Sequence, residues 1–163
     1  MYGILHDQVT IRVCPEYFTI FHPRIFPTES LTLIALGWGV VATWWVGLPL
    51  GIMLAVVCRA RAWPKLDARE LITPIAILLT VMFACAALAG LAGYFAMDCG
   101  LLRPWPWLSR TLPPEKHAAF FADLAAHNAS YWSGALGGVV LGGWALVERG
   151  RRAVADTRTN RIP

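Results

Sequence analysis

The sequence predicts an all-α membrane protein with three transmembrane helices, a small outward-facing β-hairpin and a short interfacial amphipathic helix. Residues 30–58, 71–97 and 128–147 contain no Asp, Glu, Lys or Arg, in runs of 29, 27 and 20 residues. The charged fraction is 15% and the mean hydropathy is +0.54. Apolar runs in soluble domains rarely exceed about a dozen residues, so these runs exclude both a soluble globular domain and a disordered chain.

Residues 1–30 form the first element, an outward-facing segment for which the pattern favours a hairpin. Residues 8–13 alternate between apolar and polar side chains, and residues 17–21 are rich in aromatic and β-branched side chains. Both patterns are typical of strands, and Cys14 and Pro15 separate them. Two strands alone are marginally stable in water, so we expect the hairpin to pack on the outer loop or on a partner.

Three membrane spans are predicted, at residues 31–57, 71–97 and 129–147. A helix rises about 1.5 Å per residue, so about 20 apolar residues cross the hydrocarbon core. Pro49 is expected to kink the first span, and Pro74 lies in the first turn of the second, where a missing N–H costs least. The third span is the shortest and the richest in glycine, and its alternative is a buried or re-entrant helix.

The polar segments between the spans predict the orientation. The loop 58–70 and the tail 148–163 carry nine Lys and Arg residues, whereas the longer segments 1–30 and 98–128 carry five. Basic residues are concentrated in cytoplasmic segments of membrane proteins. We therefore expect a multi-pass protein of the bacterial inner membrane, with its N-terminus and the 98–128 loop outside and its C-terminus in the cytoplasm.

The outer loop 98–128 contains the predicted interfacial helix. Pro113-Pro114-Glu115 is a typical helix start, and Phe120, Phe121, Leu124 and Ala125 follow on one side of the expected helix. This helix is expected to lie in the interface before the chain enters the third span.

Three short stretches distinguish the N-terminal segment, namely His6-Asp7-Gln8-Val9-Thr10, Cys14-Pro15-Glu16-Tyr17-Phe18-Thr19 and His22-Pro23. The stretches Gly37-Trp38-Gly39 and Ala42-Thr43-Trp44-Trp45-Val46-Gly47 follow. Together they resemble a box, with the start of the next span, found in a family of uncharacterised bacterial multi-pass membrane proteins. In many such relatives an apolar helix precedes the box. The resemblance therefore implies an outward N-terminus and a further helix upstream of this start, but it implies no activity.

Small residues recur at every fourth position of the spans, which lets helix backbones approach closely. The packing candidates are Gly39, Thr43, Gly47, Gly51 and Ala55 in the first span and Ser130, Gly134, Gly138 and Gly142 in the third. In the second span, Ala86 and Gly90 share one face, with Ala89 and Gly93 beside it. The pattern does not distinguish packing within one chain from packing between chains.

The predicted spans contain no ionisable residue other than cysteine and tyrosine, so no catalytic residue, haem or other cofactor is predicted in them. Outside the spans, imidazole and carboxylate groups are ligand types for zinc or a similar ion. The candidate ligands are His6, Asp7, Glu16 and His22. They show no tight ligand spacing, so the alternative is that they are solvated or hydrogen-bond locally. Asp123 and His127, four residues apart, are expected to pair on a helix surface.

Cys14 and Cys99 both lie in segments expected to face an oxidising compartment, where a disulfide between them is feasible. The alternative is a pair of free thiols.

The leading functional interpretation is a non-enzymatic structural or accessory component of a membrane complex, because the spans lack catalytic groups and carry small-residue faces. One alternative is a metal-binding protein or enzyme with its site in the N-terminal box and the 98–128 loop. Another is a subunit of an oligomeric transporter. The expected partners are membrane lipid and a second copy or another membrane protein. The net charge of +4 does not indicate nucleic-acid binding, because the basic residues flank apolar runs.

Overall fold

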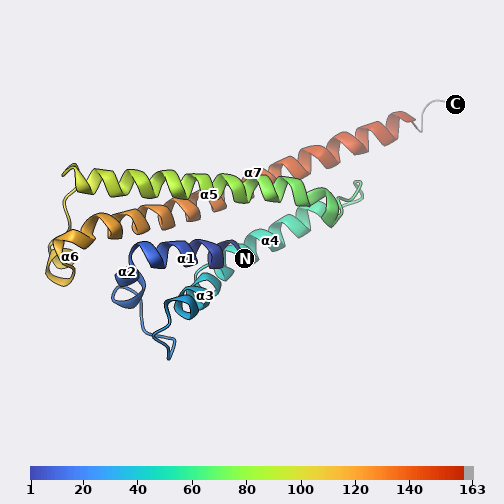
Figure 1. Ribbon diagram of the computed structural model, residues 1–163. Coiled ribbons are helices and arrows are strands. Elements are labelled where there is room, and N and C mark those ends of the chain that lie inside the picture. Colours follow the sequence, from blue (N-terminus) through green and yellow to red (C-terminus); the bar gives the residue numbers. More distant parts are fainter. Residues whose placement is uncertain (160–163) are drawn as a thin grey trace.

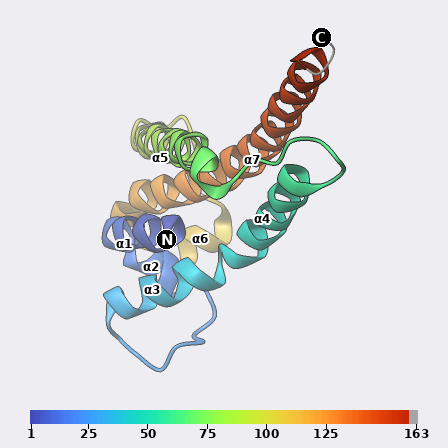
Figure 2. The same cartoon turned by 90° about the vertical axis from the view of Figure 1, so that its right-hand side faces the viewer.

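The computed structural model describes residues 1–159, and most of these are helical (Figure 1). The elements are α1 (Tyr2–Val13), α2 (Pro15–Thr19), α3 (Leu31–Val41), α4 (Trp44–Arg59), α5 (Ala68–Asp98), α6 (Pro106–Thr111), the short 3-10 helix η1 (Pro114–Lys116) and α7 (His117–Thr159). Helix α7 runs back beside α5, and α1 lies against α3 and α7 (Figures 1 and 2).

The predicted β-hairpin is wrong, because no strand occurs between residues 1 and 159. The first expected strand lies in α1, and the second begins in α2 and ends in the turn that follows Thr19. Helix α1 buries Gly3, His6, Asp7, Thr10 and Ile11, a spacing of three and four that only a helix provides. Its large apolar residues face outward instead, since Leu5, Val9 and Val13 are 64%, 55% and 43% exposed. The alternation of apolar and polar residues over 8–13 therefore does not indicate which side chains are buried.

Two helical units, rather than the three predicted, are long and apolar enough to cross a membrane. They are Leu31–Arg59, which joins α3 and α4, and Ala68–Asp98, which is α5. The expected third span, residues 129–147, is an internal part of α7, where many glycines and a Ser-Tyr-Trp-Ser stretch dilute the apolar side chains. The first unit breaks at Ala42 and Thr43, whereas Pro49 is accommodated inside α4.

Helices α5 and α7 pack closely through small residues. Ala86, Gly90 and Gly93 are the buried positions of α5 apart from Met97, and the glycines lie against Phe121, Ala122, Ala125 and Ala126 of α7. The large side chains of α5 point away, with Phe83, Leu88 and Leu91 57%, 68% and 57% exposed. Small residues inside and large apolar residues outside are the arrangement of helices packed in lipid.

The predicted helix start in the outer loop is correct in position, since η1 begins at Pro114 and α7 at His117. It is not a separate interfacial helix, because α7 continues without interruption to Thr159. Phe120 and Phe121 are buried in a cluster with Cys14, Met97, Leu108 and Leu112. This cluster joins α2, the end of α5, α6 and the start of α7.

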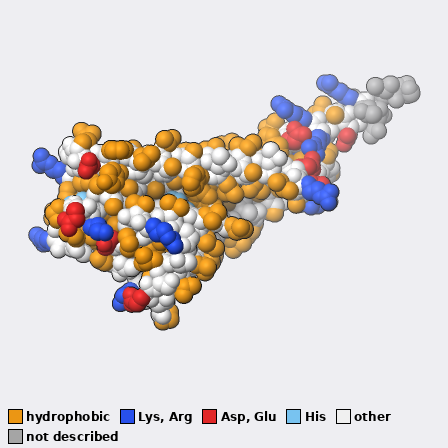
Figure 3. Space-filling model, viewed as in Figure 1, with side chains coloured by type: hydrophobic (Ala, Val, Ile, Leu, Met, Phe, Trp, Pro, Cys, Tyr) orange, Lys and Arg blue, Asp and Glu red, His pale blue; other side chains and the backbone are white. Residues whose placement is uncertain are grey.

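Charged side chains gather towards the two ends of the molecule, and the middle is mainly hydrophobic (Figure 3). At the basic end, α7 is fastened to the 60–67 loop by Arg149, which is 1% exposed. Its guanidinium donates to the carbonyls of Val57, Ala60, Trp63 (3.2 Å) and Pro64 (2.8 Å). The C-terminal basic residues and the basic loop therefore share one end.

Candidate metal centre

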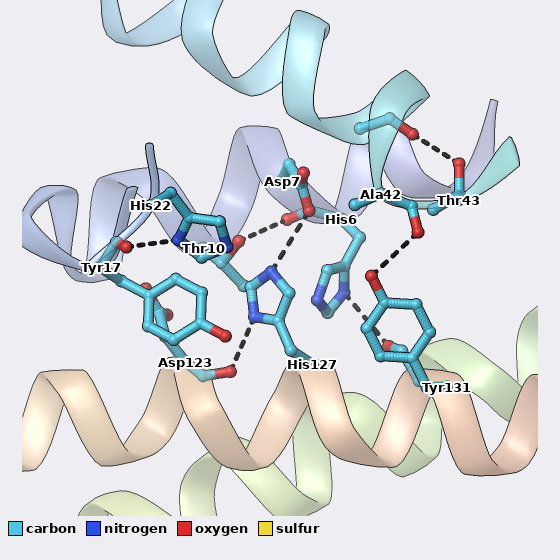
Figure 4. A network of polar contacts seen from close by, with 12 residues as sticks. His6, Asp7, Thr10, Tyr17, His22, Ala42, Thr43, Asp123, His127 and Tyr131 are labelled. Atoms are coloured by element: carbon cyan, nitrogen blue, oxygen red, sulfur yellow. Dashed lines mark hydrogen bonds and ion pairs between the residues drawn. The ribbon is translucent and has the colours of Figure 1, made fainter. Parts of the chain in front are cut away.

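Three buried side chains from two distant parts of the chain converge between α1 and α7. His6 and Asp7 come from α1 and His127 from α7, and one ligand atom of each lies within 4.8 Å of the others (Figure 4). Asp7 is 3% exposed, His6 7% and His127 9%. The group therefore sits inside the protein rather than on its surface.

Two glycines fix the position of α1 and hence of His6 and Asp7. A Cβ atom on Gly3 would lie 2.3 Å from Thr43 Cγ2, and one on Gly39 would lie 2.5 Å from Ile4 Cα. Because neither residue has a side chain, α1 and α3 cross in backbone contact. His6 and Asp7 follow Gly3 by three and four residues and therefore lie on the same side of α1, and α7 packs beside α3 against that side, which brings them to His127.

The hydrogen bonds of His127 direct one of its nitrogens at Asp7. The Nδ1–H group donates to the Asp123 carbonyl at 2.8 Å, and because a carbonyl only accepts, Nδ1 carries a proton. Nε2 then lies 3.4 Å from Asp7 Oδ1. If Nε2 bears a lone pair, it faces a carboxylate, and a cation between the two atoms relieves their repulsion.

His6 offers a second imidazole nitrogen to the group. Its Nδ1 lies 3.5 Å from Ser130 Oγ, which is 2.8 Å from the Tyr2 hydroxyl, whereas Nε2 is buried and has no hydrogen-bond partner in the described part of the chain. Burial, followed by the charge of His127, lowers the pKa of His6 to about 4. The ring is therefore neutral at neutral pH, which is the state that binds a metal ion.

Asp123 lies one turn before His127 on α7 and adds a second buried acid. Its Oδ2 atom is buried without a partner among residues 1–159. Burial, followed by the charge of Asp7, raises the pKa of Asp123 to about 9. Asp123 is therefore a neutral carboxylic acid at neutral pH while the centre holds no cation.

The spacing of the group suits zinc. Ligand atoms about 2.1 Å from a tetrahedral ion lie about 3.4 Å apart. The 3.4 Å between His127 Nε2 and Asp7 Oδ1 matches this separation. All ligand atoms lie within 4.8 Å of one another, so closing the group around an ion needs a shift of at most about 1.4 Å. Two neutral imidazoles and one carboxylate are a typical zinc ligand set.

Aromatic rings enclose the centre on one side. The Tyr17 ring stacks on His127 with centroids 4.7 Å apart, and Phe18 meets the same imidazole edge-on at 5.7 Å. These rings exclude water from the group on that side, which strengthens electrostatic interactions within it.

The structure brings together two of the four candidate ligands predicted from the sequence. His6 and Asp7 belong to the group, whereas Glu16 pairs with Lys116 at 3.2 Å and His22 Nδ1 lies 2.7 Å from the Tyr17 carbonyl. From the sequence, His127 is expected to pair with Asp123 on a helix surface and is named as a ligand only through the alternative site in the 98–128 loop. It is buried, and its Nδ1 bonds the backbone carbonyl of Asp123. The signal available in the sequence is the Asp-x-x-x-His spacing of Asp123 and His127 on a predicted helix. Nothing in the sequence shows that these side chains are buried or that α1 packs against them.

The predicted packing residues serve several neighbours rather than one interface. Gly39 and Thr43 meet α1, Gly134 meets Met82 of α5, and Gly138 and Gly142 meet Leu50 and Met53 of α4. Ser130 contacts His6, whereas Gly47 and Gly51 face open space and Ala55 is exposed. The open positions form one strip along α4.

Cys14 and Cys99 are both free thiols in the structure. Cys14 is fully buried beside Met97, and Cys99 is exposed just after α5.

No protein-family model, characterised protein or solved structure matches this chain. The resemblance of the N-terminal box to uncharacterised bacterial membrane proteins therefore stays an expectation, and the function is argued from geometry.

Proposed function

We propose that this chain is a bacterial inner-membrane protein that binds one divalent transition-metal ion, with zinc the first candidate, through His6, Asp7 and His127. The observation that carries the proposal is the convergence of three buried ligand atoms within 4.8 Å, from two segments of the chain more than a hundred positions apart. Side chains of this kind are rarely buried without a partner, because each unsatisfied polar group costs about 1–3 kcal/mol.

An ion pair between His127 and Asp7 is the simplest competing explanation. It accounts for two of the three groups, but it leaves His6 Nε2 buried without a partner in the described residues. A metal ion satisfies all three groups at once. The contacts at His127 Nδ1 and His6 Nδ1 then hold both rings, as second-layer hydrogen bonds do around metal sites.

The ion would join the N-terminal helix to the C-terminal helix, which suits an accessory role in a larger membrane complex. With three protein ligands, the fourth position of a tetrahedral ion is open for water or a substrate group, as in catalytic zinc sites. The geometry therefore supports metal binding first, and both a structural and a catalytic use of the ion follow from it.

The proposed orientation places α2, α6 and the 20–30 segment outside and the basic end in the cytoplasm. Two features support it: the charged residues gather at two ends (Figure 3), and Arg149 holds the basic tail against the basic 60–67 loop. The positive-inside rule assigns that end to the cytoplasm.

The test is metal analysis of the protein purified in mild detergent without chelator. We expect about one zinc ion per chain in the wild type and affinity reduced on the order of 100-fold or more in His127→Ala. The matched control is His22→Ala, which removes an imidazole from the same box but outside the group. A wild-type protein free of metal after zinc loading, or equal metal loss in both variants, would refute the proposal.

A further inference from the structure

A cavity of about 360 Å³ adjoins the candidate metal centre, and its volume falls in the range of small-molecule sites. It lies between α4, α5 and α7, close to the start of α1. Most of its wall is apolar, and the side chains that form this wall are Val46, Leu50, Leu78, Leu79 and Met82. Leu79 is 39% exposed, so the cavity reaches the molecular surface beside the two helical units that could cross a membrane.

The polar groups of the cavity are concentrated at one end, and they are those of the metal centre. His6, Asp7 and His127 line it there, together with Ser130 and Tyr131. Figure 4 shows Tyr131 beside His6, with its hydroxyl donating to the Ala42 carbonyl at 3.0 Å. The cavity therefore suits an occupant with one polar end and one apolar end.

Charge determines the nature of the polar end. The two imidazoles bind a metal ion as neutral ligands, and Asp7 contributes one negative charge. Asp123 lines a separate cavity on the other side of His6, and with its carboxyl group protonated a divalent ion leaves a single positive charge buried in apolar surroundings, which is costly without a counter-charge. A monovalent anion at the open fourth position neutralises the centre, and the apolar wall selects an anion that carries a hydrocarbon chain.

We propose, on the basis of the metal-binding function above, that this cavity binds a monocarboxylate with an unbranched alkyl chain. Its carboxylate takes the fourth position on the ion, and its chain lies along Val46, Leu50 and Leu79. Binding forms and breaks no covalent bond. Without the ion the carboxylate would face Asp7, so binding depends on the metal.

Native mass spectrometry of the detergent-solubilised chain tests this, because it counts zinc and ligand on the same molecule. The probes are zinc with dodecanoate, dodecanoate after chelation, and zinc with dodecan-1-ol, which keeps the chain but lacks the charge. We expect a complex of protein, zinc and dodecanoate, with affinity at least about tenfold weaker for dodecan-1-ol and for the chelated protein.

Val46→Trp fills the cavity without changing a ligand of the ion. We expect it to keep zinc and lose dodecanoate. The matched control is Val56→Trp, on the same helix at a position 58% exposed and outside the cavity wall, which should keep both. If Val46→Trp loses zinc as well, Leu79→Trp at the cavity mouth provides the same test.

The outcomes separate the two proposals. Zinc without dodecanoate, or dodecanoate bound equally with and without zinc, overturns the alkyl-carboxylate site and leaves metal binding intact. A protein that binds no zinc overturns both. Retention of dodecanoate by cavity-filled variants that keep zinc places the ligand elsewhere and also overturns the inference.

Discussion

Replacing Gly93 by alanine tests whether α5 and α7 are in backbone contact. A Cβ atom at this position would lie 2.6 Å from the Phe121 carbonyl oxygen and 2.9 Å from Ala125 Cβ. Neither atom can rotate away, since one is backbone and the other is the first atom of its side chain. Gly90, one turn earlier on the same helix, is the matched control, because its Cβ would lie 3.4 Å from the Ala122 carbonyl oxygen, an ordinary contact.

The magnitude follows from the difference between the two sites. Alanine at Gly93 forces the helices apart by several tenths of an ångström, and overpacking of this kind costs about 1–3 kcal/mol. The gain in helix propensity from glycine to alanine, about 1 kcal/mol, is shared by both variants and cancels in the comparison. We therefore expect Gly93→Ala to be less stable than Gly90→Ala by about 1–3 kcal/mol.

The assay is reversible unfolding in mixed micelles of increasing sodium dodecyl sulfate content, followed by far-ultraviolet circular dichroism and tryptophan fluorescence. Both variants are compared with the wild type at the same protein concentration. Equal free energies of unfolding for the two variants, or a more stable Gly93→Ala, would show that the helices are not in backbone contact there.

Three further predictions concern buried polar groups. Arg149→Lys should lower the free energy of unfolding by about 2 kcal/mol or more, because an ammonium group cannot reach all the carbonyls that the guanidinium binds, whereas the exposed control Arg151→Lys should change little. Burial raises the pKa of the Cys14 thiol to about 12, so maleimide at neutral pH should label the exposed Cys99 and leave Cys14 unlabelled until the protein unfolds, and labelling of native Cys14 would contradict its burial. In metal-free protein, Asp123 has a folded pKa of about 9, above its usual value of 3.8, so its contribution favours folding most at low pH and is lost as pH rises towards 9. Asp123→Asn should therefore flatten the fall in stability between pH 5 and 9, a slope of up to about 1.4 kcal/mol per pH unit, and an unchanged slope would refute the assignment.

The sequence predicts two of the three long apolar helices well, because a run of more than about 20 apolar residues is recognised from composition alone. The predicted span 71–97 corresponds to α5 (Ala68–Asp98), and the apolar run before Arg59 corresponds to α3 and α4. The start of α5 is also determined locally, since Asp67 and Glu70 form a reciprocal capping box. Composition and local hydrogen bonding are enough for these elements.

Helix α1 could not be predicted by the same reasoning, because its polarity is reversed relative to a soluble helix. Strand and helix patterns are interpreted on the assumption that apolar side chains are buried within the protein. In α1 the buried side chains include His6, Asp7 and Thr10, while Leu5 and Val9 are exposed. The alternation over residues 8–13 is therefore incidental to the fold.

The candidate metal centre depends on the same exchange of buried and exposed side chains in α1. The buried His6 and Asp7 side chains of α1 meet polar groups of α7, namely Ser130 and His127. Contact between these helices requires α1 to be held by α3, which the crossing at Gly3 and Gly39 allows. Gly39, a packing position predicted from the sequence, thus acts on the site indirectly, because together with Gly3 it sets the position of α1 from which His6 and Asp7 approach His127. The candidate ligands alone do not specify the centre, and neither do the glycines. The centre forms only because the glycine contacts hold α1 where His6 and Asp7 face His127.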